Sequence, residues 1–404
     1  MSSRRRSFDQ PGGTVFALAV AVMVFAMGAA ALTWREPRQR SSSAPGNGRL
    51  AEGRDACSVK ALTKTNVDGI VVPSPDGRRY LVNKEDARGI GQIYIGTTGS
   101  TGLTCISCTQ EPGGPKPDRY KTQPAWHPSG RWIFVPVERD KYSRPPILGW
   151  NKGFVKGQIR NGLWTNTWAV SPDGARWVRL TDFSSTPAGT PDGFTGPAVT
   201  DDGRKLAWSQ IVDGNILKYT FGRWELMLAD FEETHGTPAL VNPRNITPDK
   251  MYWNEVGNFH PDNESLLLSG SVEKRAEGMD QYVLNIRTRQ LINLTNTPAV
   301  WDEHGLFSPD GKKIIFMSAY PYRDDRNSSG VLTLKTEFML MDTDGSHLTQ
   351  LTHFRARGYP ESNKRGVAAN PVWNPDGRSA ALRVLLFPDY EDWMVEFEGP
   401  CGRQ

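Results

Sequence analysis

A short turn phrase followed by a short apolar run recurs six times along the chain. The phrases begin at Ser74, His127, Thr200, His260, Ser308 and Asn374, between 48 and 73 residues apart. In the Ser-Pro-Asp-Gly form, the proline fixes φ, the aspartate bonds its own backbone and the glycine supplies a positive φ. Each phrase therefore predicts a hairpin turn that leads into a strand, such as the apolar run Lys313–Phe316.

A second hairpin follows within each unit and leads into a Leu-Thr phrase. It is clearest where Asp342–Ser346 precedes Leu348–Thr352. Ser171–Gly174 has the same Ser-Pro-Asp-Gly sequence as the first turn of a unit. Because Leu180-Thr181 follows it, we assign it to the outer hairpin of the second unit. The units therefore number six rather than seven, and their length is near that of a four-stranded propeller blade with variable loops.

This repeat resembles that of the TolB-type β-propeller family. The turn phrase, the strand, the aspartyl-Gly hairpin and the closing Leu-Thr all match, over about residues 57–401. The resemblance implies an all-β fold with six blades. Because propellers host binding, scaffolding and catalysis alike, the resemblance leaves the function open.

The last unit lacks one strand. It contains Val372-Trp373, Ala380–Val384 and Trp393–Phe397, and no fourth strand ending in Leu-Thr follows. That phrase occurs instead at Ser58–Thr63, where the folded part begins. We therefore predict that the N-terminal strand completes the sixth blade and removes an unpaired sheet edge.

The same closure bears on the four cysteines. It places Cys57 beside the strand that leads to Cys401, which predicts a disulfide between them. Cys105 and Cys108 then pair locally or stay reduced, and a structural disulfide is our default. A zinc site is disfavoured because no second C-x-x-C exists, and a thioredoxin-like role because no helix follows Cys108.

Composition and charge narrow the function classes. The chain has 404 residues with 40 Gly and 29 Pro, which is typical of a turn-rich protein rather than a mostly helical one. Its formal net charge is +4, but residues 1–54 hold eight basic and three acidic residues, which leaves the other 350 with a net charge of −1. A near-neutral folded part argues against a nucleic-acid-binding domain.

The positive charge belongs to a leader. Arg4–Arg6 precede the uncharged apolar run Thr14–Leu32, and Ala29–Ala31 offers a cleavage site. The run of 19 residues is also long enough to span a bilayer uncut. Residues 1–33 are therefore interpreted as a signal peptide or a signal anchor.

The type of export signal stays open. Arg5–Phe8 resembles the core of a twin-arginine signal, and an ordinary positive start is the alternative. The polar residues 34–54 are interpreted as a flexible tether, and residues 55–404 as the propeller. We expect a periplasmic or extracellular protein, held at the membrane if the leader is uncleaved.

An antiparallel meander places the long connections on one face, which we call the long-loop face and expect to bind ligands. Two similar segments there, Trp253–Gly257 and Trp301–Gly305, each lead into an innermost strand. Their polar residues should ring the mouth of a central channel; the candidates are Asn254, Glu255, Asp302, Glu303 and His304. Carboxylates with an imidazole suit a divalent cation, calcium or similar. The alternative is that they bond neighbouring blades.

Aromatic and charged residues in other long connections form a second group of candidates. These are Trp150, Tyr320, Tyr322, Arg323, Tyr359 and Glu361. Aromatic anchors and arginines are enriched at interfaces, which favours a binding role. The alternative is that they are ordinary solvated loops.

Several catalytic motifs are missing from the sequence. It contains no G-x-S-x-G, no H-E-x-x-H and no Walker phosphate loop. This favours an exported, non-enzymatic propeller that binds a protein or cell-envelope ligand on its long-loop face. The alternative is a divalent-cation-dependent enzyme, similar to a polysaccharide lyase, that uses the channel-mouth carboxylates and His304.

Overall fold

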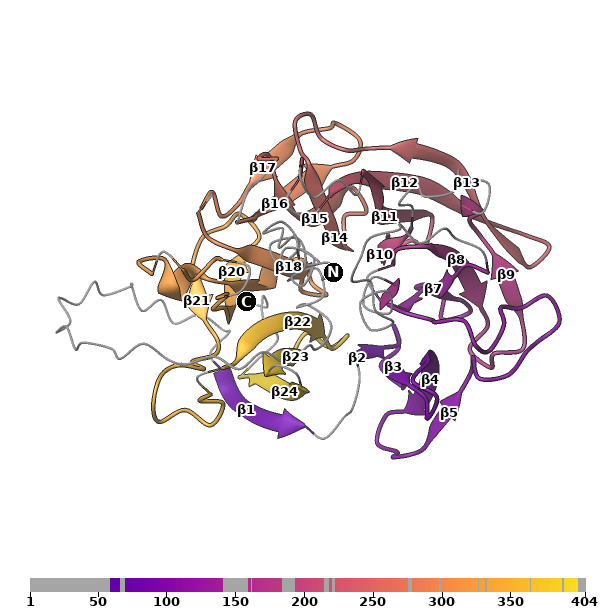
Figure 1. The fold of residues 1–404 in the computed structure, drawn as a ribbon, viewed down its shortest axis with the longest axis horizontal. Helices are drawn as coiled ribbons and strands as arrows, with labels where there is room; N and C mark the ends of the chain where they lie inside the picture. Colours follow the sequence, from indigo (N-terminus) through magenta and orange to yellow (C-terminus); the bar gives the residue numbers. More distant parts are fainter. Residues whose placement is uncertain are drawn as a thin grey trace, which may run out of the picture.

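Six four-stranded antiparallel sheets are arranged in a ring in the structure, a computed structural model (Figure 1). It describes residues 59–65, 70–140, 159–160, 162–183, 193–213, 218–219, 222–274, 278–297, 299–325, 327–330, 333–363, 365–386 and 389–398. The leader 1–33, the tether 34–54, Cys57, Trp150 and Cys401 lie outside these residues. Within the described ranges, no helix is long and apolar enough to cross a membrane.

The first three blades follow one another along the chain. Blade 1 consists of β2 (Ile70–Pro73), β3 (Arg79–Glu85), β4 (Gly91–Thr97) and β5 (Leu103–Cys105). Blade 2 consists of β6 (Ala125–Trp126), β7 (Ile133–Glu138), β8 (Thr165–Val170) and β9 (Trp177–Arg179). Blade 3 consists of β10 (Thr195–Val199), β11 (Lys205–Asp213), β12 (Arg223–Thr234) and β13 (Thr237–Asn245).

The next two blades continue in the same order, and the sixth takes its outer strand from the other end of the chain. Blade 4 consists of β14 (Trp253–Phe259), β15 (Ser265–Ser271), β16 (Asp280–Asn285) and β17 (Leu291–Asn293). Blade 5 consists of β18 (Asp302–Phe307), β19 (Lys313–Ser318), β20 (Glu337–Asp342) and β21 (Thr349–Gln350). Blade 6 consists of β22 (Val367–Trp373), β23 (Ser379–Leu386), β24 (Asp389–Phe397) and β1 (Val59–Thr65).

The predicted closure of the sixth blade is confirmed. β1 pairs antiparallel with β24, with Leu62 opposite Val395 and Lys64 opposite Trp393. β24 therefore has a partner on both sides, and every blade has four strands. The fold is the all-β, six-bladed propeller that the repeat predicts.

The Pro-Asp-Gly hairpins form by the predicted turn chemistry. In the first one, the amide of Gly77 donates to the carbonyl oxygen of Ser74 over 2.8 Å. Oδ1 of Asp76 accepts from Ser74 Oγ at 2.6 Å and from the amide of Arg78 at 3.1 Å. Gly77 has a φ of 67°, the left-handed conformation that favours glycine.

Two of these turns carry a histidine, and each histidine bonds the next blade. Nε2 of His127 lies 3.0 Å from the carbonyl oxygen of Gly203, and Nε2 of His260 lies 3.0 Å from that of Gly311. A Cβ at Gly203 would lie 2.6 Å from the His127 ring, so the close approach requires glycine there. Both histidines therefore link consecutive blades.

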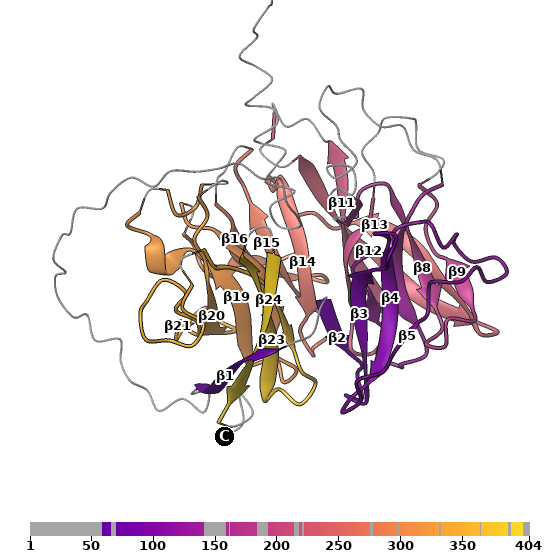
Figure 2. The same ribbon diagram turned by 60° about the horizontal axis from the view of Figure 1, so that its bottom comes forward.

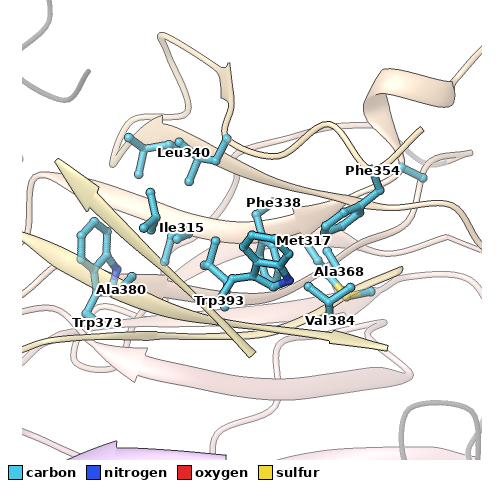
Figure 3. Packing of buried hydrophobic residues seen from close by; sticks show 14 of the residues in the cluster. Ile315, Met317, Phe338, Leu340, Phe354, Ala368, Trp373, Ala380, Val384 and Trp393 are labelled. Atoms are coloured by element: carbon cyan, nitrogen blue, oxygen red, sulfur yellow. The ribbon is translucent and has the colours of Figure 1, made fainter. Parts of the chain in front are cut away.

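Apolar clusters fill the spaces between neighbouring blades. The one between blades 5 and 6 contains Ile315, Phe338, Trp373 and Trp393 (Figure 3). Similar clusters join blades 1 and 2, 2 and 3, 3 and 4, and 4 and 5. Among the described residues, no such cluster joins blades 6 and 1. At that junction the chain itself makes the connection, because β1 in blade 6 is followed by β2 in blade 1.

Two of the four cysteines lie in the described part of the chain. Cys105 ends β5, and a disulfide joins it to Cys108, with a Cα–Cα distance of 5.7 Å. Of the two alternatives for this pair, the structure has the local disulfide. The predicted Cys57–Cys401 disulfide falls outside the described residues.

The strands run between two faces of the ring (Figure 2). Because strand direction alternates, the Pro-Asp-Gly hairpins and the outer hairpins share one face. The connections from second to third strand and from one blade to the next form the opposite, long-loop face. The short 3-10 helix η2 (Tyr320–Tyr322), between β19 and β20, belongs to the long-loop face.

Candidate functional site

The inner strands share a local irregularity that re-aims side chains. The pairing register shifts within β10, β14, β18 and β22 as each pairs with the second strand of its blade. The equivalent residues, five before each turn phrase, are Thr122, Thr195, Glu255, Glu303 and Ala369. The residue that follows has a positive φ at Gln123 (41°), Gly196 (61°) and His304 (56°). Of these five equivalent residues, only Glu255 in blade 4 and Glu303 in blade 5 are acidic.

Three of the predicted residues come together at this level, and we call them the Glu-Glu-His cluster: Glu255, Glu303 and His304. One ligand atom from each lies within 4.8 Å of the other two. Nε2 of His304 lies 3.3 Å from Oε1 of Glu255. Because of the bulge, the consecutive residues Glu303 and His304 both join the cluster, which regular strand alternation does not allow.

Neighbouring groups hold the cluster in place. Nδ1 of His304 lies 3.1 Å from the carbonyl oxygen of Ala369 in β22, so the imidazole also contacts blade 6. Nε1 of Trp301 donates to Oε2 of Glu303 over 2.8 Å. The three side chains therefore have fixed orientations at the meeting point of blades 4, 5 and 6.

Burial and mutual contact determine the protonation of the cluster. Burial raises the pKa of Glu303, and the neighbouring carboxylate of Glu255 adds to the rise. Burial also acts to raise the pKa of Glu255, but the adjacent imidazole outweighs it and lowers that pKa. Burial acts to lower the pKa of His304, and the two carboxylates outweigh it and raise the pKa to about 10. These shifts favour an ion pair between Glu255 and His304 and the protonated form of Glu303.

The other two predicted channel-mouth residues do not join the cluster. Asn254 is buried and donates from Nδ2 to the carbonyl oxygen of Trp224 in blade 3, over 2.9 Å. Asp302 is buried, and its Oδ2 accepts from Thr297 Oγ1 at 2.6 Å. Burial raises the pKa of Asp302 to about 6. Both residues bond the framework around the cluster.

The candidates in the connection between β19 and β20 divide into outward and inward side chains. The guanidinium carbon of exposed Arg323 lies 4.4 Å from the centroid of the Tyr320 ring. The hydroxyl of Tyr322 donates to the buried carboxylate of Glu337. Exposed Arg323 is therefore available to a ligand. Tyr320 is partly buried and packs against the apolar cluster of blades 5 and 6, and the Tyr322 hydroxyl bonds within blade 5.

The candidates in the connection between β21 and β22 divide in the same way. The Tyr359 side chain is 45% exposed, and its ring stacks on that of His353 with a centroid distance of 4.0 Å and an interplanar angle of 10°. Glu361 is buried, and its Oε1 accepts from the amide of His353 at 2.8 Å. Glu361 thus orders the segment that presents Tyr359.

Sequence reasoning missed several groups that build this region. Glu337 is fully buried and accepts from Thr352 Oγ1 at 2.7 Å and from the amide of Phe354 at 3.0 Å. His353 supports Tyr359, and the guanidinium carbon of Arg355 lies 5.1 Å from the centroid of the Tyr322 ring. The acid at the start of the apolar strand β20 was the one available signal. Its burial depends on contacts between loops.

Comparison with known proteins gives structural neighbours. No family model matches the chain, and no curated protein matches its sequence. A putative TolB from Agrobacterium tumefaciens has a TM-score of 0.47 and 16% identity, over 74% of this chain and 82% of that one. TolB from Acinetobacter baumannii has a TM-score of 0.43 and 14% identity, over 84% of this chain and 64% of that one. The chain is a six-bladed β-propeller with TolB proteins among its structural neighbours.

An enzyme is also among these neighbours. An oligogalacturonate lyase in complex with manganese has a TM-score of 0.44 and 12% identity, over 83% of this chain and 90% of that one. These likenesses concern the fold alone. The chain spans less than two thirds of the Acinetobacter baumannii protein.

Proposed function

We propose that this chain is an exported, non-enzymatic propeller that binds a protein or cell-envelope ligand on its long-loop face. The observation that carries the proposal is the exposed ring of Tyr359, held flat against His353. A large aromatic side chain that is already ordered loses little conformational freedom on binding. Such rigid anchors contribute a large share of the binding free energy at protein interfaces.

Neighbouring groups of the same face extend this surface. Tyr320 and Arg323 lie together in η2 and the residue after it, and Arg323 is exposed. Arg357 and Arg365 are exposed in the same connection as Tyr359. Tyrosine and arginine are residue types enriched at the centres of interfaces. Trp150 belongs to the proposed face by its position in the sequence.

The sequence of the leader supports the proposed location outside the cytoplasm. The apolar run Thr14–Leu32 after Arg4–Arg6 has the pattern of an export signal. We propose a periplasmic or extracellular location, with attachment to the membrane when the leader is retained. The ligand is then another protein or a component of the cell envelope.

Site-specific photo-crosslinking in the native envelope tests the proposal. A photoreactive residue at exposed Ser362, three positions from Tyr359, should give a reproducible crosslinked product. The matched control is exposed Thr288, in the hairpin between β16 and β17 on the opposite face. Tyr359→Ala should lower the yield at Ser362 about tenfold, as expected for a lost anchor. No product at Ser362, or equal products at both positions, contradicts the proposal.

The Glu-Glu-His cluster favours a second candidate function, a divalent-cation-dependent enzyme similar to a polysaccharide lyase. A carboxylate beside a bound cation can accept a proton from an acidic sugar polymer. Incubation with polygalacturonate and a divalent cation should then give an unsaturated product, followed by its ultraviolet absorbance. Glu303→Gln should abolish the reaction. No product from the wild-type chain with any cation eliminates this candidate.

A further inference from the structure

We infer that Glu255, Glu303 and His304 form a binding site for one divalent first-row metal ion, such as Mn²⁺ or Zn²⁺. Two carboxylates and one imidazole offer ligand atoms within 4.8 Å of one another. The site goes beyond ligand binding on the long-loop face and does not depend on it.

The donor set indicates the class of ion. Calcium prefers oxygen ligands alone, whereas an imidazole nitrogen with carboxylate oxygens suits manganese and zinc. The sequence alone suggested calcium or a similar ion. The 3.3 Å approach of His304 Nε2 to Glu255 Oε1 puts the nitrogen inside the donor set and favours the first-row ions instead.

The surrounding groups have the arrangement that metal ligands require. A ligating histidine usually donates its other ring nitrogen to a carbonyl or carboxylate, which fixes the tautomer. Here Nδ1 of His304 bonds the carbonyl oxygen of Ala369, and Nε2 is the nitrogen that faces Glu255. Glu303 likewise accepts from Trp301 Nε1, which leaves its other oxygen, Oε1, for an ion.

An orphaned oxygen beside the cluster is a second, independent observation. Gln281 is 0% exposed, and its Oε1 has no hydrogen-bond partner among the described residues. Gln281 lies in the same cross-strand row of blade 4 as Ser269 and Glu255, and its Oε1 lies against Gly305, the residue after His304. A buried carbonyl oxygen normally accepts a hydrogen bond, so Oε1 of Gln281 is expected to have a donor that is not a side chain or backbone group of the described residues. Water bound to the metal ion would supply it.

Comparison with equivalent positions argues against a purely structural role for the two acids. In blade 2, Thr122 Oγ1 donates to the carbonyl oxygen of Arg160 at 2.7 Å. In blade 3, Thr195 Oγ1 donates to Oε1 of Gln123 at 2.5 Å. Neutral hydrogen bonds therefore satisfy this level of the ring in blades 2 and 3. Blades 4 and 5 instead place two carboxylates and an imidazole there, which are residue types that bind divalent ions.

The binding step balances in protons. Imidazole and carboxylate groups bind metal in their deprotonated forms, so binding of a divalent ion releases to solvent any protons that these groups carry, and the affinity rises with pH.

Metal binding by the full-length protein tests the inference. After EDTA treatment and dialysis, Mn²⁺ is titrated and its free concentration is followed by electron paramagnetic resonance. Zn²⁺ and Ca²⁺ are titrated by calorimetry. We expect one Mn²⁺ or Zn²⁺ per chain, weaker Ca²⁺ binding, and a metal-dependent rise in melting temperature. Glu255→Gln and Glu303→Gln should each weaken Mn²⁺ binding at least tenfold.

Asp302→Asn is the control, because it changes the adjacent buried acid and leaves all three ligands. It should keep the wild-type Mn²⁺ affinity. Failure of the wild-type chain to bind Mn²⁺ or Zn²⁺ overturns the inference, and so does binding that survives both glutamine substitutions. Tighter binding of Ca²⁺ overturns the assigned class of ion. Because no substrate is present, these results are independent of the enzyme candidate and of the ligand on the long-loop face.

Discussion

Nε2 of His304 in β18 lies 3.3 Å from Oε1 of Glu255 in β14, so one imidazole joins the inner strands of blades 4 and 5. Its other ring nitrogen bonds Ala369 in blade 6. One side chain thus contacts three consecutive blades next to the ring axis. In the metal-free protein this contact is a partly buried ion pair.

Removal of either partner should destabilise the ring. We expect His304→Ala to lower the free energy of unfolding of the metal-free protein by roughly 2 kcal/mol, between the values for exposed and buried ion pairs, because it leaves the partly buried carboxylate of Glu255 without its partner. Urea unfolding in the presence of EDTA measures the change. In a double-mutant cycle with Glu255→Ala, the second substitution should cost at least about 1 kcal/mol less when the first is present. Additive effects contradict a direct interaction.

Lys121 predicts an unusual pH dependence. This side chain is fully buried, and its Nζ donates to the carbonyl oxygens of Lys116 at 3.0 Å and Pro117 at 3.3 Å. Burial lowers its pKa from 10.5 to about 8. The unfolded chain therefore binds the proton more tightly than the folded one, and stability rises as the pH increases from about 8 to about 10.5.

The comparison with Lys121→Met isolates this effect. Relative to the variant, the wild-type free energy of unfolding should rise by roughly 3 kcal/mol over that pH interval, since one pKa unit corresponds to about 1.4 kcal/mol. Chemical unfolding at a series of pH values measures both proteins. A constant difference between them would mean that Lys121 titrates alike in the folded and unfolded states.

The turns and the closing strand could be predicted because local chemistry determines them. Asp76 and Gly77 make the same turn in almost any context, so the repeat was countable from the sequence. The phrase Ser58–Thr63 overlaps the observed β1, Val59–Thr65, because a missing fourth strand leaves one place for it. These features depend on few residues, and those residues are close together in the chain.

The candidate site was predicted only in part. Successive side chains of a strand point to opposite faces of the sheet, so Glu255 and its neighbour Asn254 point to opposite sides, as do Glu303 and its neighbour Asp302. This rule could be applied to the sequence alone. The bulge that brings Glu303 and His304 into one cluster could not be predicted in this way, because it arises from the pairing of β18 with β19. The burial of a charged residue likewise depends on which connections fold over it.

Tyr322 should contribute to stability rather than to ligand binding. Its hydroxyl donates to the buried carboxylate of Glu337, which also accepts from Thr352. Tyr322→Phe should lower the free energy of unfolding by about 1.5–3 kcal/mol, the range for a hydrogen bond to a charged group. Tyr359→Phe is the control, and its unfolding midpoint in urea should match the wild type. Equal midpoints for all three proteins contradict this role.

The strand β1 should be essential to the closed ring. Leu62 of β1 packs against the cluster of blades 5 and 6, and β1 covers the edge of β24 that carries Trp393 and Val395. A chain that begins at residue 66 should be less stable by at least about 3 kcal/mol, from the lost apolar burial and strand hydrogen bonds. It should also self-associate, because the exposed edge of β24 can pair with another chain.

A chain that begins at residue 55 keeps β1 and is the matched control. Urea unfolding measures the stability of both chains, and light scattering coupled to size exclusion measures their mass. The shorter chain should show an earlier midpoint and a mass that increases with concentration, whereas the control should show neither. No apolar cluster of the described residues joins blades 6 and 1, so packing between these blades should not compensate for the missing strand. Equal midpoints and equal masses for the two chains would show that the ring closes without β1.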